Sequence, residues 1–113
     1  MKNTESLKNT YQFSQVYNNG ISHADRNLVM YVLRNNTDMN RLGISVSKKV
    51  GNSVVRHRLC RLIRESYRLH ENMFNSGLDI VIIARKGTKD IDYHKIEESL
   101  LHLSDVHHIY KED

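Results

Sequence analysis

The stretch of sequence that decides the fold is residues 45–65, SVSKKVGNSVVRHRLCRLIRE. It begins within a strand over residues 41–47, where apolar side chains alternate with small or polar ones, as in a half-buried strand. It then passes through Gly51 into a helix that Asn52 or Ser53 can cap. The exposed N–H groups and the dipole of a helix N-terminus attract phosphate, and two lysines before the glycine add positive charge beside it.

The helix that follows has two different sides. We expect it to run to about Phe74, and on a helical wheel its apolar residues gather on one side, which predicts a face packed against the core. The residues on this side are Val55, Leu59, Leu62, Leu69 and Met73, with Ile63 at the edge. The opposite side carries His57, Arg61, Arg64 and Arg68, and the two sides are flanked by Arg56 and Arg58.

Positive charge is concentrated in this region. Between Lys48 and Arg68 there are seven lysines and arginines and one acid, Glu65, so the segment carries +6. The whole chain carries +4, which leaves −2 for all other residues. A solvated helix face usually mixes the two signs, whereas one dominant sign rich in arginine suggests a polyanionic partner, most simply nucleic acid.

The remaining elements follow from periodicity and turn signals. We expect a helix over residues 10–19 capped by Asn9, an edge strand at 21–23, a strand at 27–34, a continuous apolar strand at 78–84 and a last helix capped by Asp92. The strand at 27–34 is expected to pair with the strand at 41–47 as a hairpin, and the helix between the third and last strands implies that these two are parallel. The order α-β-β-β-α-β-α predicts an α/β (α+β) two-layer sandwich with a mixed sheet.

The length of 113 residues predicts a single domain, 1–113, with residues 1–8 and 106–113 frayed or variable. No apolar run approaches the ~20 residues of a membrane span, and the N-terminus lacks the apolar segment of a signal peptide. The single cysteine, Cys60, cannot form an internal disulfide and fits a reducing cytosol. We therefore expect a cytoplasmic protein without a membrane partner.

The sequence contains no motif of a protein nuclease: no paired-carboxylate motif, no HExxH and no Cys/His zinc spacing. His107 and His108 could bind a metal, but in a polar tail they are more simply solvated. His57 could be a general acid–base or, better, a phosphate or base contact, and Cys60 could be a reactive or an inert thiol. We assign no catalytic residue, no metal ligand and no small-molecule substrate.

Residues 45–64 resemble the signature of the bacterial ribonuclease P protein subunit, S-x-x-K-x-x-G-x-A/S-x-x-R-N-R-x-K/R-R-x-x-R. The matching positions are Ser45, Lys48, Gly51, Ser53, Arg56, Arg58, Arg61 and Arg64. His57 stands in place of the central Asn, and Cys60 occupies a position that is commonly basic. Further matches, in the same order as in the family, are Phe13, Val16, Tyr17, Gly20, Arg26, the strand 28–31 and the DIVIIARK stretch at 79–86.

The resemblance covers about residues 7 to 103 and implies a sandwich with a left-handed crossover around the arginine-rich helix, against the usual preference. It also implies that the polypeptide binds a large catalytic RNA, that the complex removes the 5′ leader of precursor tRNA, and that Mg²⁺ acts through the RNA. The polypeptide alone is then expected to be inactive.

Two sets of site residues follow from the resemblance. The catalytic RNA is expected at Lys48, Lys49, Asn52, Arg56, His57, Arg58, Arg61, Arg64 and Arg68. The leader is expected in a cleft lined by Phe13, Tyr17 and Tyr31, where rings can stack on bases. From the residues alone, the spacing of Phe13, Val16 and Tyr17 is more simply that of a core stripe.

Two other functions remain as alternatives. A non-enzymatic RNA-binding or ribosome-associated protein would share the basic helix but would not need the aromatic cleft. A DNA-binding regulator is disfavoured, because the basic helix lacks the preceding short helix and tight turn of a helix-turn-helix.

Overall fold

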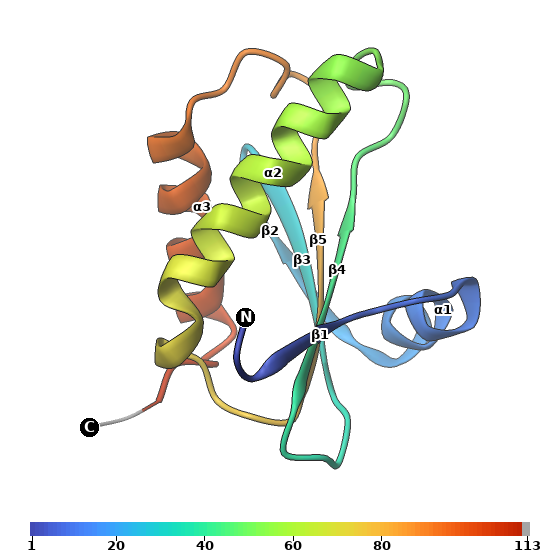
Figure 1. Ribbon diagram of the computed structural model, residues 1–113, viewed down its shortest axis with the longest axis vertical. Helices are drawn as coiled ribbons and strands as arrows, with labels where there is room; N and C mark the ends of the chain where they lie inside the picture. Colours follow the sequence, from blue (N-terminus) through green and yellow to red (C-terminus); the bar gives the residue numbers. More distant parts are fainter. Residues whose placement is uncertain (112–113) are drawn as a thin grey trace.

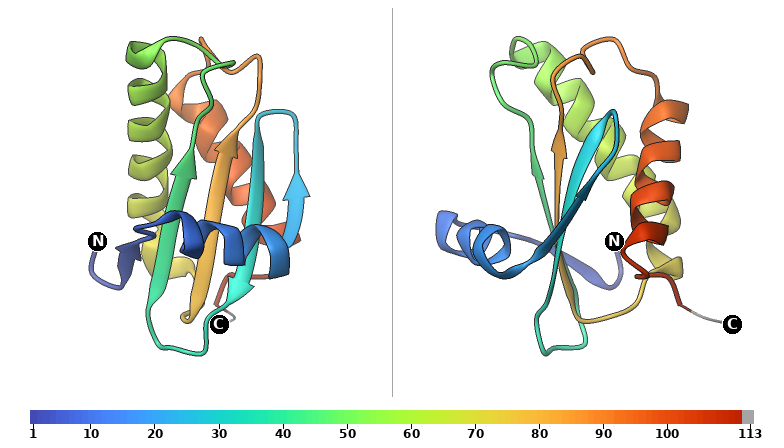
Figure 2. Two further views of the ribbon diagram at one scale, coloured as in Figure 1. Left: turned by 90° about the vertical axis from the view of Figure 1, so that its right-hand side faces the viewer. Right: turned by 180° about the vertical axis from the view of Figure 1, so that it is seen from behind.

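A five-stranded mixed sheet with the strand order β1-β4-β5-β3-β2 organises the molecule. The computed structural model describes residues 1–111. The elements are β1 (Thr4–Ser6), α1 (Thr10–Asn19), β2 (Ile21–Ala24), β3 (Leu28–Arg34), β4 (Asn40–Ser45), α2 (Ser53–His70), the 3₁₀ turn η1 (Glu71–Met73), β5 (Leu78–Ala84) and α3 (Tyr93–Val106). Helices α2 and α3 cover one face of the sheet and α1 crosses the other (Figures 1 and 2). The predicted α/β sandwich with a mixed sheet is confirmed.

Strand β5 lies at the centre of the sheet, between β4, with which it is parallel, and β3, with which it is antiparallel. The predicted hairpin between β3 and β4 is therefore wrong, because β5 separates the two strands. A continuous apolar strand gains most burial in the middle of a sheet covered on both faces, and six of the seven residues of β5 are buried. At the lower end, Asp79 in β5 accepts hydrogen bonds from Asn35 beyond β3 and Arg41 in β4.

The connection from β4 through α2 to β5 is a left-handed crossover. In the left panel of Figure 2, seen from the α1 side, the chain rises along β4 and passes behind the sheet through α2. It then returns upward along β5, to the right of β4. This handedness is rare among parallel strand connections and agrees with what the family resemblance implies.

The N-terminal segment pairs with the sheet, which differs from the frayed end expected over residues 1–8. Strand β1 pairs in parallel with β4, and the Thr4 hydroxyl lies 2.9 Å from the hydroxyl of Tyr67 in α2. The Glu71 carboxylate accepts backbone N–H groups of Lys2 at 3.0 Å and Asn3 at 3.3 Å. These bonds fix the segment against the α2 layer, and the apolar side chain of Leu7 is buried at its end.

The chain after α3 is also held in place up to Lys111. Ile109 is buried, Tyr110 forms an antiparallel bridge with Phe74, and the Lys111 N–H donates to the Met73 carbonyl at 2.8 Å. The Tyr110 and Phe74 rings stack with centroids 5.5 Å apart. These contacts differ from the frayed end expected over residues 106–113, of which residues 112–113 lie outside the described residues.

Helix α2 buries a face rotated from the predicted one. Leu59 and Ile63 are buried as expected, but Leu69 and Met73 are 56% and 48% exposed. Tyr67 takes their place, since its ring stacks on Phe74 at 5.0 Å and its hydroxyl is bonded to Thr4. A tyrosine can bury a large apolar area when its hydroxyl has a hydrogen-bond partner. The predicted apolar face contains only aliphatic residues and methionine, and therefore leaves Tyr67 out. The helix also ends at His70, so Met73 belongs to the η1 turn.

The end of α3 is attached to the β2–β3 hairpin by histidine. His107 is half-buried and its Nε2–H donates to the Met30 carbonyl at 2.9 Å, so the expectation of a solvated side chain is wrong for this residue. The His23 ring lies edge-on, with centroids 4.6 Å apart. Burial and the neighbouring His23 lower the pKa of His107, although the hydrogen bond to Met30 opposes this.

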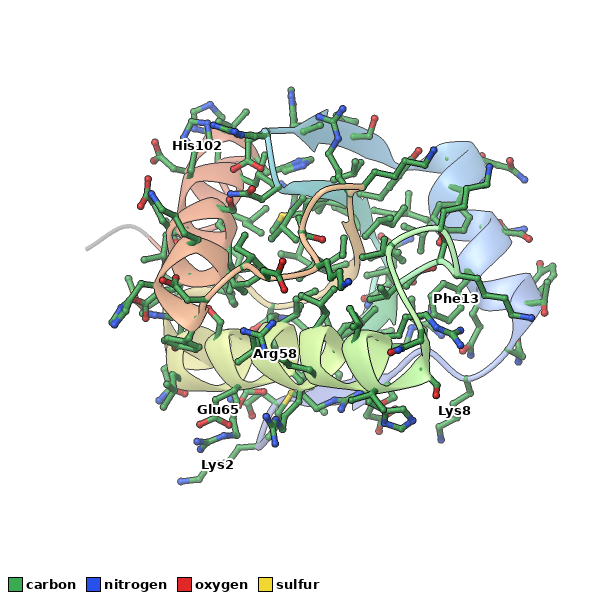
Figure 3. All side chains as sticks on the ribbon, turned by 90° about the horizontal axis from the view of Figure 1, so that it is seen from above. Lys2, Lys8, Phe13, Arg58, Glu65 and His102 are labelled. Carbon is green, nitrogen blue, oxygen red and sulfur yellow. The ribbon has the colours of Figure 1, made fainter. Side chains whose placement is uncertain are left out.

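This arrangement gives a testable pH dependence. Because the folded state binds the His107 proton less tightly than the unfolded state, stability falls as the pH drops through and below the ordinary histidine value of 6.5. We expect the melting temperature of the His107→Gln variant, which can still donate to Met30, to fall less between pH 7.5 and pH 5 than that of the unsubstituted chain. His102→Gln, at an exposed position on the same helix (Figure 3), is the control. An equal fall in melting temperature between pH 7.5 and pH 5 for the unsubstituted chain and the His107→Gln variant would contradict the assignment.

Candidate nucleic-acid interface

The start of α2 is built as the sequence predicts. Asn52 is the cap, because its side-chain oxygen accepts the Val55 N–H at 3.0 Å, and Ser53 is the first helical residue. Lys48 and Lys49 are exposed in the turn just before it. Free N–H groups, the positive end of the helix dipole and two ammonium groups thus lie together at one solvent-exposed place, which suits an anion.

An arginine ridge, which we define as His57, Arg61, Arg64 and Arg68, runs along the outer side of α2, and all four side chains are exposed. Arg68 forms an ion pair with Glu65 at 2.5 Å, so its charge is partly balanced. Within residues 1–111, no hydrogen bond or ion pair engages Arg61 or Arg64. Their guanidinium groups are therefore available to a phosphate ligand, for which the planar fork is well suited.

An open groove of about 1170 Å³ lies between α2 and the end of β4. One wall is the strand, with Ile44, Ser45 and Val46. The other wall is formed by residues 53–64 of α2, including Arg56, Arg61 and Arg64. The groove combines apolar side chains on the strand wall with cationic side chains on the helix wall, which are the two features that a nucleic-acid strand uses.

Arg58 differs from the ridge residues with which the sequence groups it. Its Nη2 donates to the Ile91 carbonyl at 2.6 Å, and its Nη1 is buried without a partner among the described residues. Figure 3 shows Arg58 on the side of α2 that faces the loop between β5 and α3, while Glu65 lies on the outer side. Arg58 therefore holds the loop over residues 85–92 against the arginine helix.

This geometry gives different expectations for two arginines of the same helix. Arg58→Ala removes a charge-assisted hydrogen bond worth about 1.5–3 kcal/mol and is expected to lower both the melting temperature and the affinity for RNA. Arg68→Ala removes an exposed charge that Glu65 already balances and is expected to change both much less. Thermal melting and RNA titration of the two variants check this, and a larger loss for Arg68→Ala would contradict it.

Further basic residues, which the sequence reasoning missed, lie at the same end of the sheet as Lys48. They are the exposed residues Arg26, Arg85, Lys86 and Lys89. Arg85 donates to the carbonyl of Asp25 at 2.7 Å, which joins the loop after β5 to the β2–β3 turn. The net charge around these residues in the sequence is small, because acidic residues lie close to them. The parallel pairing of β4 and β5 could have revealed them, because the residues that follow two parallel strands lie at the same edge of the sheet (Figure 2).

The three predicted aromatic residues come together between α1 and the sheet. The Phe13 and Tyr17 ring centroids are 6.3 Å apart, and those of Tyr17 and Tyr31 are 5.1 Å apart. Val16, from the same helical stripe, is fully buried, whereas Tyr17 is 37% exposed and the other two rings are half-buried. The helical stripe is therefore part of the core at Val16. At the edge of the stripe, Phe13 and Tyr17 join Tyr31 of β3 in what we call the aromatic surface, defined as Phe13, Tyr17 and Tyr31.

The aromatic surface adjoins the groove. Burial raises the pKa of the Tyr17 phenol, and the neighbouring Ser45 side chain partly opposes this, so Tyr17 lies beside the strand that forms the groove wall. Phe13 and Arg64 also line a common smaller cavity of about 320 Å³ next to β1. The rings and the arginines therefore belong to one continuous surface.

Cys60 is the remaining candidate from the sequence for a chemically active side chain, and it lines the groove. Cys60 is half-buried in the groove wall, and burial raises the pKa of its thiol against the effect of Arg64 and Arg56, which favours the inert interpretation. No cluster of three His, Cys, Asp or Glu side chains suitable for a metal ion occurs among these residues. None of their helices has the length and apolar character needed to cross a membrane.

Comparisons with known proteins agree on one family. The Ribonuclease P family model matches residues 1–107. The ribonuclease P protein component of Lachnoclostridium phytofermentans is 62% identical over 106 residues, covering 94% of this chain and 91% of the relative. That of Clostridium botulinum strain Langeland is 50% identical over 105 residues, covering 91% and 93%.

Solved structures give the same result. The RNase P protein of Staphylococcus aureus superposes with a TM-score of 0.86 at 37% identity, covering 94% of this chain and 97% of that one. The RNase P protein of Thermotoga maritima superposes with a TM-score of 0.81 at 32% identity, covering 88% and 94%.

Proposed function

The chain belongs to the ribonuclease P protein family, and we propose that it binds the catalytic RNA of this ribonucleoprotein and the 5′ leader of precursor tRNA. Membership makes it a component of a ribonuclease holoenzyme with an RNA partner. The finer assignment, that it promotes endonucleolytic removal of the leader to give the mature 5′ end of tRNA in the cytoplasm, is our proposal.

The observation that carries this proposal is the continuity of two chemically different surfaces. The guanidinium groups of Arg61 and Arg64, which form no ion pair with any of residues 1–111, offer phosphate contacts along α2. The aromatic surface begins at Tyr17, beside Ser45 on the opposite groove wall. A structured RNA needs mainly the first surface, and a single strand with unpaired bases can also use the second.

We propose that the RNA supplies the catalytic chemistry and that the protein positions its substrate. The interface is cationic, and no described cluster of carboxylates fits a divalent ion. Mg²⁺ prefers oxygen ligands and substrate phosphates, so the ions needed for phosphodiester cleavage belong with the RNA. On the protein side, arginine and lysine balance phosphate charge, while stacked rings hold leader bases of any sequence.

Leader recognition is tested by comparing precursor and mature tRNA, which differ only in flanking RNA. The reconstituted holoenzyme is expected to bind a precursor with a short leader more tightly than mature tRNA, and the RNA alone is expected to show a smaller preference. Equal preference with and without the protein would refute the leader contact. A ribosome-associated RNA-binding protein would give no such preference.

A further inference from the structure

Strand β4 contains a glycine directly under one ring of the aromatic surface. Gly43 pairs with Val81 of β5 and lies on the face of the sheet that α1 crosses. A Cβ at position 43 would come within 2.6 Å of both Cε1 and Cζ of Phe13, and within 2.9 Å of Cδ1 of Leu7. No side chain other than hydrogen fits under the ring as it is placed here.

Backbone conformation does not explain this glycine. The glycines with positive φ in the described residues are Gly77 and Gly87, and Gly43 is not among them. A glycine within a strand interior costs stability, because it is flexible and has no side chain to pack. What Gly43 supplies is therefore space for the Phe13 ring.

We propose that Gly43 is a positioning residue for leader recognition, which sets where the Phe13 ring lies relative to the sheet and to Tyr17. The inference rests on the proposed function, in which Phe13 contacts the leader. With no side chain on Gly43, the ring lies against β4 while its centroid stays 6.3 Å from that of Tyr17. Tyr17 in turn meets Tyr31, so the place of the first ring determines the shape of the whole aromatic surface.

Substitution at this position acts on the ring more than on the fold. The atoms that a new methyl group would meet are the far ends of two flexible side chains, Phe13 and Leu7. Rotation of the Phe13 side chain relieves the contact without moving α1, which is anchored through the fully buried Val16. The ring then leaves its place in the aromatic surface while the arginine ridge is untouched.

The test is a double-mutant cycle on the reconstituted holoenzyme with Gly43→Ala, Phe13→Ala and the double variant. We expect Gly43→Ala to weaken binding of precursor tRNA roughly tenfold, the scale of one stacked base, and to leave binding of mature tRNA unchanged. In the Phe13→Ala background, adding Gly43→Ala is expected to cost nothing further, because the ring that it displaces is already gone. Leu7→Ala with and without Gly43→Ala is the matched cycle for the second contact.

Each outcome separates this inference from the function on which it rests. If Phe13→Ala alone leaves precursor binding unchanged, the leader contact itself is refuted. If Phe13→Ala weakens binding but Gly43→Ala does not, only the positioning role is overturned. The positioning role would also be overturned if the loss of binding caused by Gly43→Ala disappeared in the Leu7→Ala background, or if that loss were equal for precursor and mature tRNA. If the Gly43→Ala variant is too unstable to measure, the double variant is compared with Phe13→Ala alone, because Phe13→Ala relieves the contact with the ring. Any further loss of precursor binding in the double variant then counts against the proposal.

Discussion

Replacement of both Arg61 and Arg64 by alanine is expected to lower the affinity for the catalytic RNA by about 100-fold or more. Each guanidinium–phosphate contact is worth ~1.5–3 kcal/mol, and neither residue has another partner among residues 1–111 that would compete for it. The slope of log K against log salt concentration should become shallower by about 1.4–1.8, since two fewer phosphates are neutralised. Titrations at several salt concentrations measure both quantities.

The matched control removes the same charge elsewhere. Arg34 and Lys95 are exposed and lie outside α2 and the groove, so the Arg34→Ala/Lys95→Ala variant should bind the RNA nearly as well as the unsubstituted chain. Both double variants should melt normally, because the altered side chains are exposed. If the control loses as much affinity as the Arg61/Arg64 variant, binding depends on net charge and the ridge is not the contact.

Replacement of Tyr17 by alanine is expected to weaken binding of precursor tRNA by the holoenzyme about tenfold and to leave mature tRNA unaffected. Stacking on one base contributes about 1–3 kcal/mol and tolerates any base, as a leader-binding ring requires. Tyr17 is 37% exposed and adjoins the groove through Ser45, so a base can reach it. Tyr11→Ala, on the same helix at a position 71% exposed, is the control and should change neither affinity.

The competing interpretation is that Tyr17 is core. Truncation of a buried aromatic residue costs ~3–5 kcal/mol of stability, which would appear as a large fall in melting temperature with equal loss for both tRNA forms. Melting curves recorded beside the two binding assays separate the interpretations.

The parts of the fold that depend on local signals could be predicted from the sequence. Asn9, Asn52 and Asp92 each cap a helix through a side-chain hydrogen bond to a backbone N–H three residues later. The bounds of α1 agree with the prediction, and β5 is buried as its apolar run indicates. These features depend on neighbours within a few residues, which the sequence displays directly.

The errors concern contacts between distant segments. Nothing local indicates that β5 separates β3 from β4, or that the N-terminal segment is held by Glu71 and Tyr67, more than sixty residues away. Contacts between distant segments also explain why one residue of the candidate site differs from its predicted role. Arg58 belongs to the charge run in sequence, but its contact is the carbonyl of Ile91, which only the β5–α3 loop brings near.

Leader removal by a reconstituted holoenzyme shows directly whether the chain acts in 5′ processing of precursor tRNA. The purified chain is mixed with a bacterial catalytic RNA and precursor tRNA at a Mg²⁺ concentration at which the RNA alone cleaves slowly, and kcat/KM for leader removal is measured. We expect the chain to raise kcat/KM, the Arg61→Ala/Arg64→Ala variant to do so far less, and the chain without RNA to cleave nothing. An unchanged kcat/KM on adding the chain, or cleavage by the chain alone, would contradict this expectation.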